Sequence, residues 1–76
     1  MKKIGIHGST GSIGTQALEI IRNDKNITCV YLTAYSNVDL LISQAIEFKP
    51  KYICLVDDTK EDFLRDQLSS KNIEIL

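Results

Sequence analysis

The sequence predicts an α/β fold: a Rossmann-like doubly wound parallel sheet, of which the chain supplies the N-terminal βαβαβα part and the start of a further strand. Short runs rich in β-branched and aromatic residues alternate with segments of helical periodicity, and short connections separate them. The strand-like runs are nearly continuous in apolar residues, as in buried parallel strands. A glycine-rich loop follows the first of these runs directly, which is typical of nucleotide-binding folds.

The first elements follow one another in the order that a βαβ unit requires. Residues 2–7 predict a strand, residues 8–14 (GSTGSIG) a loop, and residues 15–22 a helix. A second strand is predicted over residues 27–33, after a short turn.

The second helix is predicted from an apolar stripe at positions 38, 41, 42, 45 and 46. Ser36 and Asp39 have the spacing of a capping pair at its start, and Pro50 ends it. A third strand is then expected over residues 52–56.

The last third of the chain predicts one more helix and an incomplete strand. Asp57 and Asp58 supply turn and cap residues before a shorter helix, and residues 73–76 begin a fourth strand. Because the chain stops inside that element, we expect residues 1–76 to be the N-terminal part of an NADP-binding Rossmann domain that is truncated, with the catalytic and C-terminal domains absent. A self-sufficient mini-domain is the alternative.

The three glycines of the loop have separate expected roles. Gly8 makes the turn that leaves the strand, Gly11 lets the backbone approach a pyrophosphate, and Gly14 lets helix and strand pack closely. Free N–H groups at the helix start, with about half a positive charge from the helix dipole, receive the anion. Thr10 and Ser12 place hydroxyl groups beside the same phosphates, although loop and cap roles alone also explain them.

The loop after the second strand, residues 33–37 (TAYSN), predicts a preference for NADP(H) over NAD(H). NAD-dependent relatives of this fold carry an acid about 20 residues after the glycine loop, which binds the ribose 2′-hydroxyl. No carboxylate is present in residues 33–37, so a 2′-phosphate is not repelled, and Ser36 and Asn37 offer hydrogen-bond donors. The alternative is that Ser36 or Asn37 only caps the second helix.

Composition excludes several other classes of protein. The chain is 43% hydrophobic and 25% charged with a net charge of −1, so it lacks the basic surface of a protein that binds nucleic acid or an anionic membrane. No apolar run approaches the roughly 20 residues that cross a bilayer, and the N-terminus lacks a secretory signal. We therefore expect a cytoplasmic protein, or a plastid protein if a eukaryotic transit peptide has been removed, with no nucleic-acid or membrane partner.

Other residues with chemical potential have plainer explanations. Cys29 and Cys54 lie in strand-like runs without metal-site spacing and are interpreted as reduced core thiols. His7 has no acid or nucleophile beside it in sequence, so a buried, hydrogen-bonded ring explains it better than catalysis. Turn chemistry accounts for Asp57 and Asp58 better than a metal site does.

Three stretches together resemble the N-terminus of the 1-deoxy-D-xylulose 5-phosphate reductoisomerases. They are residues 8–15 (GSTGSIGT), residues 34–38 with Asn37, and residues 47–52 (EFKPKY). The resemblance implies an oxidoreductase that depends on NADPH and on divalent Mg or Mn and is usually a homodimer. It would convert the sugar phosphate 1-deoxy-D-xylulose 5-phosphate to 2-C-methyl-D-erythritol 4-phosphate, by rearrangement and hydride reduction, in the non-mevalonate pathway of isoprenoid biosynthesis.

The resemblance also implies which positions contact the cofactor. Carried over by position, with Gly8 from the loop itself, they are Gly8, Thr10, Gly11, Ser12, Ile13, Ser36 and Asn37. The ligands of the metal and of the substrate phosphate lie downstream in that family, so this chain is expected to supply neither catalytic nor metal-binding residues.

The chain departs from the family pattern in its second loop and at His7, where the family usually has an apolar residue. That loop commonly reads glycine, often a basic residue, then asparagine, whereas this chain has Tyr35 and Ser36 before Asn37. Without a basic side chain in this loop, we expect weaker binding of a 2′-phosphate. Tyrosine in place of the family's glycine would alter the loop backbone if that glycine takes positive φ. The competing hypotheses are another NADP-dependent dehydrogenase, of the semialdehyde or short-chain type, and a non-catalytic nucleotide-binding module.

Overall fold

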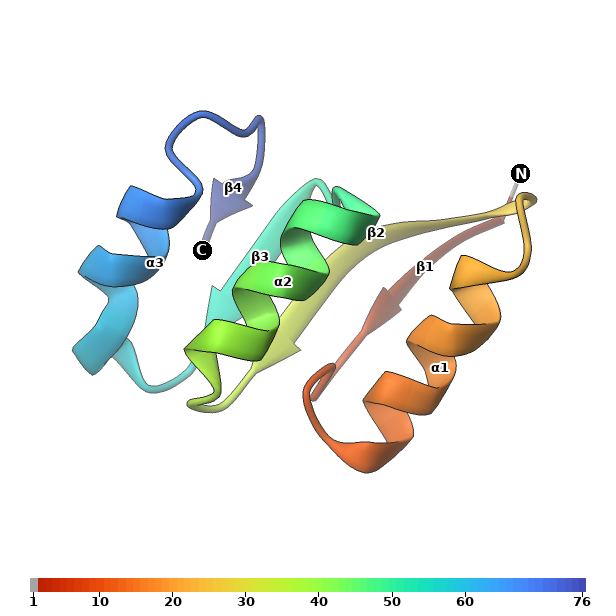
Figure 1. Ribbon diagram of the computed structural model, residues 1–76, viewed down its shortest axis with the longest axis horizontal. Helices are drawn as coiled ribbons and strands as arrows, with labels where there is room; N and C mark the ends of the chain where they lie inside the picture. Colours follow the sequence, from red (N-terminus) through yellow and green to blue (C-terminus); the bar gives the residue numbers. More distant parts are fainter. Residues whose placement is uncertain (1) are drawn as a thin grey trace.

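A four-stranded parallel sheet forms the centre of the computed structural model, which describes residues 2–76 (Figure 1). The strands are β1 (Lys2–Ile6), β2 (Ile27–Ala34), β3 (Tyr52–Leu55) and β4 (Glu74–Ile75), and they lie in this order across the sheet. Each neighbouring pair is parallel, so the carboxyl ends of all the strands lie at the same edge. The predicted α/β fold class is confirmed.

The helices lie together on one face of this sheet, as Figure 1 shows. They are α1 (Ser12–Arg22), α2 (Val38–Phe48), the 3-10 turn η1 (Asp58–Lys60) and α3 (Glu61–Gln67). Helix α1 begins at Ser12, about one turn before the predicted start at residue 15, because Gly11 has extended backbone (φ −79°, ψ 174°) and caps the helix directly.

The core lies between the helices and the sheet. Alternate side chains of the strands face the helices, and Leu32 and Ile53 are both fully buried. They pack in one cluster with buried leucines from each helix, namely Leu18, Leu41 and Leu64. The apolar stripe of α2 predicted from the sequence therefore faces the sheet, although its last member, position 46, is exposed.

The other face of the sheet is uncovered in the part of the chain that the structure describes (Figure 1). Tyr31 lies across Gly5, where an added Cβ atom would collide with the tyrosine ring, and its hydroxyl is 3.1 Å from His7 Nε2. The His7 ring is hydrogen-bonded as predicted, but the prediction that it is buried is wrong, because none of the elements formed by residues 2–76 covers this face. Cys54 lies half-buried, whereas Cys29 is buried and its burial raises the pKa of its thiol.

Helix α1 packs on the loop after β1 through Gly14, which is buried. A Cβ atom at this position would collide with the carbonyl oxygen of Gly8 and lie 2.7 Å from Ser9 Cα. Backbone therefore packs directly on backbone here, and only glycine permits the contact. Gly14 thus permits the close packing that was predicted, but against the loop after β1 rather than against the strand itself.

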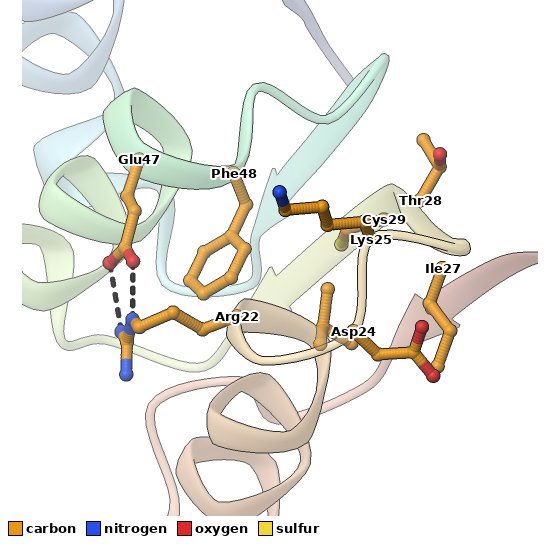
Figure 2. A pocket seen from close by; sticks show the side chains of 9 residues that line it. Arg22, Asp24, Lys25, Ile27, Thr28, Cys29, Glu47 and Phe48 are labelled. Atoms are coloured by element: carbon orange, nitrogen blue, oxygen red, sulfur yellow. Dashed lines mark hydrogen bonds and ion pairs between the residues drawn. The ribbon is translucent and has the colours of Figure 1, made fainter.

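An ion pair joins α1 to α2 at the opposite end of the sheet, beside an open hollow of about 320 Å³ (Figure 2). Arg22 donates from Nε and Nη2 to both carboxylate oxygens of Glu47, and Nη2 lies 2.8 Å from Oε1. The guanidinium also lies 5.3 Å from the centre of the Phe48 ring. The hydrogen bonds from Arg22 are the main cause that lowers the pKa of the Glu47 carboxyl.

Gly14→Ala should destabilise the chain by about 1–3 kcal/mol, because the new methyl group forces α1 away from the loop. Urea unfolding of both forms measures the difference. Gly11→Ala is the matched control, since a Cβ atom there would only touch Gly8 O at 3.4 Å. Equal losses in the two variants would contradict the packing role of Gly14.

The Arg22–Glu47 pair should make the stability of the chain sensitive to acid. A carboxyl whose pKa is lowered by folding stabilises the fold above its unfolded pKa, and that contribution is lost as the pH falls through the folded pKa. The free energy of unfolding of the wild type should therefore decrease as the pH falls below 4.5, the ordinary pKa of a glutamate carboxyl. It should decrease less in Glu47→Gln. Urea midpoints across this range provide the test, and parallel curves for the two proteins would contradict it. The effect is small because both side chains are 44% exposed.

Candidate functional site

The loop between β1 and α1 is held in place by β2. Gly8 has a left-handed backbone (φ 64°), which favours glycine and turns the chain out of the strand. Its N–H donates to Thr33 Oγ1 at 3.0 Å, and the N–H of Ser9 donates to Thr33 O at 2.8 Å. A further bond from Gly11 N to Gly8 O (3.0 Å) closes the turn. The turn role predicted for Gly8 is confirmed.

The start of α1 offers backbone N–H groups to an anion. No side chain caps this helix and no acid lies in its first turn. The first backbone hydrogen bond of the helix runs from Thr15 N to Gly11 O at 2.9 Å. The N–H groups of Ser12, Ile13 and Gly14 come before it and have no acceptor within the helix. With the positive end of the helix dipole behind them, these N–H groups suit a phosphate.

Gly11 differs from Gly14 in that the fold gives no reason for it to be glycine. Its φ and ψ are those of extended backbone, which any residue adopts, and an added Cβ atom would meet nothing closer than Gly8 O at 3.4 Å. The space beside Gly11 is therefore open on its outer side. This is the geometry expected where a ligand, rather than the protein, approaches the backbone.

The remaining predicted residues of this loop lie around the same helix start. Gly11 and Ser12 are exposed, Thr10 is partly buried, and Ile13 is 83% exposed although it is a large apolar side chain. The Thr15 hydroxyl is directed back into the helix, to Ser12 O at 3.0 Å. The predicted loop residues are thus together and reachable from solvent, Thr10 less so than the others.

The second loop lies between β2 and α2, and its last residue, Asn37, caps the start of α2. Asn37 Oδ1 accepts from Leu40 N at 3.2 Å, so the predicted capping pair of Ser36 with Asp39 is wrong. Asn37 directly precedes the helix and its carbonyl oxygen accepts the first helical bond, from Leu41 N at 3.1 Å, so its side chain stands at the capping position. The bond from Leu40 N uses only the acceptor of the Asn37 amide, whose NH₂ group is left to donate outward.

Tyr35 does not distort this loop. Lys49 is the one non-glycine residue with positive φ among residues 2–76, so Tyr35 has an ordinary backbone conformation. The glycine that the family commonly has at this place is thus not needed for its φ. Tyr35 is 71% exposed, and Ser36 beside it is also exposed.

The two loops lie at neighbouring strand ends, because Ile6 of β1 pairs with Leu32 of β2. Figure 1 shows them next to each other at the same edge of the sheet. The next strand end is joined to them by Asp57 N, which donates to Tyr35 O at 2.7 Å. Asp57 itself caps η1, and its hydrogen bonds from Thr59 lower the pKa of its carboxyl, which agrees with the predicted turn role.

Three residues that support the site were not identified from the sequence. Thr33 accepts from both Gly8 and Ser9, and Ser9 forms two buried hydrogen bonds with Gln44 of α2. One signal was available: Gln44 is a polar residue within the apolar face of α2, and a buried amide requires a partner. Ser9 and Thr33 have no comparable signal, because serine and threonine are ordinary in loops and strands.

Neither a metal site nor a membrane span is formed by the residues described. Among residues 2–76, no group of three or more His, Cys, Asp or Glu side chains could hold a metal ion. Within the same range, the helices are too short and too polar to cross a bilayer.

Several known proteins with similar sequences share one description. The profile of the 1-deoxy-D-xylulose 5-phosphate reductoisomerase family matches residues 4–76. A reductoisomerase of this name from Thermoanaerobacter sp. strain X514 is 53% identical over the whole chain, and one from Chloroherpeton thalassium is 47% identical. The chain spans 20% of the length of each of these relatives.

Solved structures agree in fold. A DOX-P reductoisomerase crystallised with NADPH, fosmidomycin and magnesium superposes with a TM-score of 0.91 at 35% identity, over all of this chain and 19% of that one. The Zymomonas mobilis reductoisomerase in complex with NADPH gives a TM-score of 0.92 at 27% identity, over 97% of this chain and 20% of that one. The match in sequence and the match in structure lead to one conclusion: the chain belongs to the 1-deoxy-D-xylulose 5-phosphate reductoisomerase family.

Proposed function

We propose that the chain is the N-terminal part of the NADPH-binding domain of a 1-deoxy-D-xylulose 5-phosphate reductoisomerase. The complete enzyme would rearrange 1-deoxy-D-xylulose 5-phosphate and reduce the product to 2-C-methyl-D-erythritol 4-phosphate, a step of non-mevalonate isoprenoid biosynthesis. NADPH would supply the hydride. The part played by this chain is to bind and orient the cofactor.

The proposal rests on the open space beside the backbone of Gly11. A Cβ atom at this position has room in the protein, yet the residue is glycine and stands at an uncapped helix start. A cofactor diphosphate would occupy that space and accept from the N–H groups of Ser12 and Ile13. The exposed side chain of Ile13 would then lie against the cofactor and lose its contact with water.

The second loop would hold the adenosine end of the cofactor. Residues 33–37 carry no charge, so they neither repel a 2′-phosphate nor hold it with a salt bridge. The Ser36 hydroxyl and the NH₂ group of Asn37 would donate to it, since the Asn37 acceptor is already used by Leu40. Thr10 and Gly8 complete the proposed set in the first loop.

Other properties of the complete enzyme are proposed from its family. We propose that a divalent Mg or Mn ion and the substrate phosphate are bound by residues outside this chain, and that the intact enzyme is a homodimer. We further propose that it acts in the cytoplasm, or in plastids if the source is a eukaryote. Family membership supports these proposals.

The full-length protein carrying this segment should oxidise NADPH only when 1-deoxy-D-xylulose 5-phosphate and a divalent cation are both present. Absorbance at the NADPH band follows turnover.

Gly11→Ala should raise the Kd for NADPH at least about tenfold, because the methyl group occupies the space of the diphosphate. Fluorescence titration gives the Kd.

Two outcomes would count against the proposal. A full-length protein that binds no NADPH would refute it, and unchanged affinity in Gly11→Ala would show that the diphosphate lies elsewhere. The urea midpoint of Gly11→Ala serves as the control, since the added Cβ atom meets only Gly8 O at 3.4 Å and should leave the fold intact.

Ser36→Asp should reverse the preference between the two coenzymes. A carboxylate at this position repels the 2′-phosphate of NADPH and can bind the 2′-hydroxyl of NADH, so the Kd for NADPH should rise about tenfold or more while that for NADH does not. Ser36→Ala is the control that removes the hydroxyl without adding charge. Parallel changes for both coenzymes in Ser36→Asp would place the 2′-phosphate away from this loop.

A further inference from the structure

A buried polar pair connects the first loop to α2. Ser9 is 0% exposed and Gln44 is 6% exposed. Ser9 Oγ donates to Gln44 Oε1 at 2.7 Å, and Gln44 Nε2 donates to the carbonyl oxygen of Ser9 at 2.8 Å. One amide group is thus hydrogen-bonded to both the side chain and the backbone of a single loop residue.

The position of Gln44 is not explained by core packing. It lies on the buried face of α2, where Leu41 and Ala45 are fully buried. An apolar side chain at this place would pack without an amide to satisfy, but it would leave the buried hydroxyl and carbonyl oxygen of Ser9 without the partners that Gln44 supplies. The glutamine is better explained by the loop that it holds.

Ser9 is the most constrained residue of that loop. Its N–H is bound by Thr33 O, its carbonyl oxygen and hydroxyl by Gln44, and its Cα atom lies against Gly14 of α1. Displacement of Ser9 would therefore move the turn and the first N–H groups of α1 together.

Gln44 is also rigidly connected to the second loop. It lies on α2, the helix whose start is capped by Asn37. The pair therefore fixes the first loop against the same helix that presents the second. A ligand that spans both loops would depend on this relative placement.

We propose that Gln44 is a positioning residue for the cofactor: through Ser9 it fixes the N–H groups that bind the diphosphate relative to the loop that binds the adenosine end. Gln44 itself does not contact the cofactor in this proposal and acts through its two hydrogen bonds with Ser9. This inference rests on the proposed NADPH-binding function and assigns part of that function to a buried residue of α2.

Gln44→Leu in the full-length enzyme tests the proposal, because it removes both hydrogen bonds with little change in volume. The Kd for NADPH should rise about tenfold, while kcat at saturating NADPH stays near the wild-type value. Amide hydrogen exchange of residues 9–14 should be faster in this variant in the absence of any ligand.

Two further variants separate positioning from general stability. Leu64→Ala removes a fully buried side chain of α3 that is not part of the loop, so it should lower Tm but leave the NADPH Kd and the loop exchange unchanged. Ser9→Ala deletes one hydroxyl and keeps the bond to its carbonyl oxygen, so its effect should be smaller than that of Gln44→Leu. The double variant should bind more tightly than the product of the single losses predicts, since both changes remove one shared interaction.

The possible results distinguish a failure of the positioning role of Gln44 from a failure of the proposed NADPH-binding function. Wild-type NADPH affinity and loop exchange in both Gln44→Leu and Ser9→Ala would overturn the positioning role and leave the proposed function standing. Equal loss of affinity in Leu64→Ala would also overturn it, because stability alone would then explain the effect. A wild-type enzyme that binds no NADPH would overturn the proposed function and the cofactor role of Gln44 together.

Discussion

The contact between α1 and the preceding loop is made by backbone alone, and the rest of the site depends on it. Because Gly14 has no side chain, the first turn of the helix lies against Gly8 and Ser9, where even a methyl group would collide. This closeness sets the direction in which the helix leaves the sheet and turns its first N–H groups outward. Gly8 completes the arrangement with a left-handed conformation that other residues adopt only at a cost.

The two ends of the sheet are organised for different purposes. At the carboxyl ends of β1 and β2, Thr33 accepts hydrogen bonds from Gly8 and Ser9, and Gln44 forms two with Ser9. The exposed side chains at this end include two large ones, Ile13 and Tyr35. At the opposite end, the Arg22–Glu47 pair joins α1 to α2 on the surface. The cofactor is proposed to bind at the first of these ends.

Local sequence patterns were sufficient for most of the fold and for the first loop. Strand-like runs, the apolar stripe of α2 and the spacing of Gly8, Gly11 and Gly14 each depend on residues close together in the chain. The features that sequence did not reveal depend on distant partners: Ser9 and Gln44 are 35 positions apart, and His7 is exposed because the helices lie on the other face of the sheet. The cap of α2 is Asn37 rather than Ser36 because the helix begins at Val38, with its first backbone bond from Leu41 N to Asn37 O, and the sequence pattern allowed both residues.

We propose that main-chain N–H groups at the start of α1, made accessible by glycine, bind the diphosphate of NADPH. A crystal structure of the full-length protein with NADPH would show where the diphosphate lies. Diphosphate oxygens should lie within hydrogen-bond distance, about 2.7–3.2 Å, of the N–H groups of Ser12 and Ile13, with a phosphate packed against Gly11. A bound cofactor whose diphosphate lies away from this helix start would contradict this proposal.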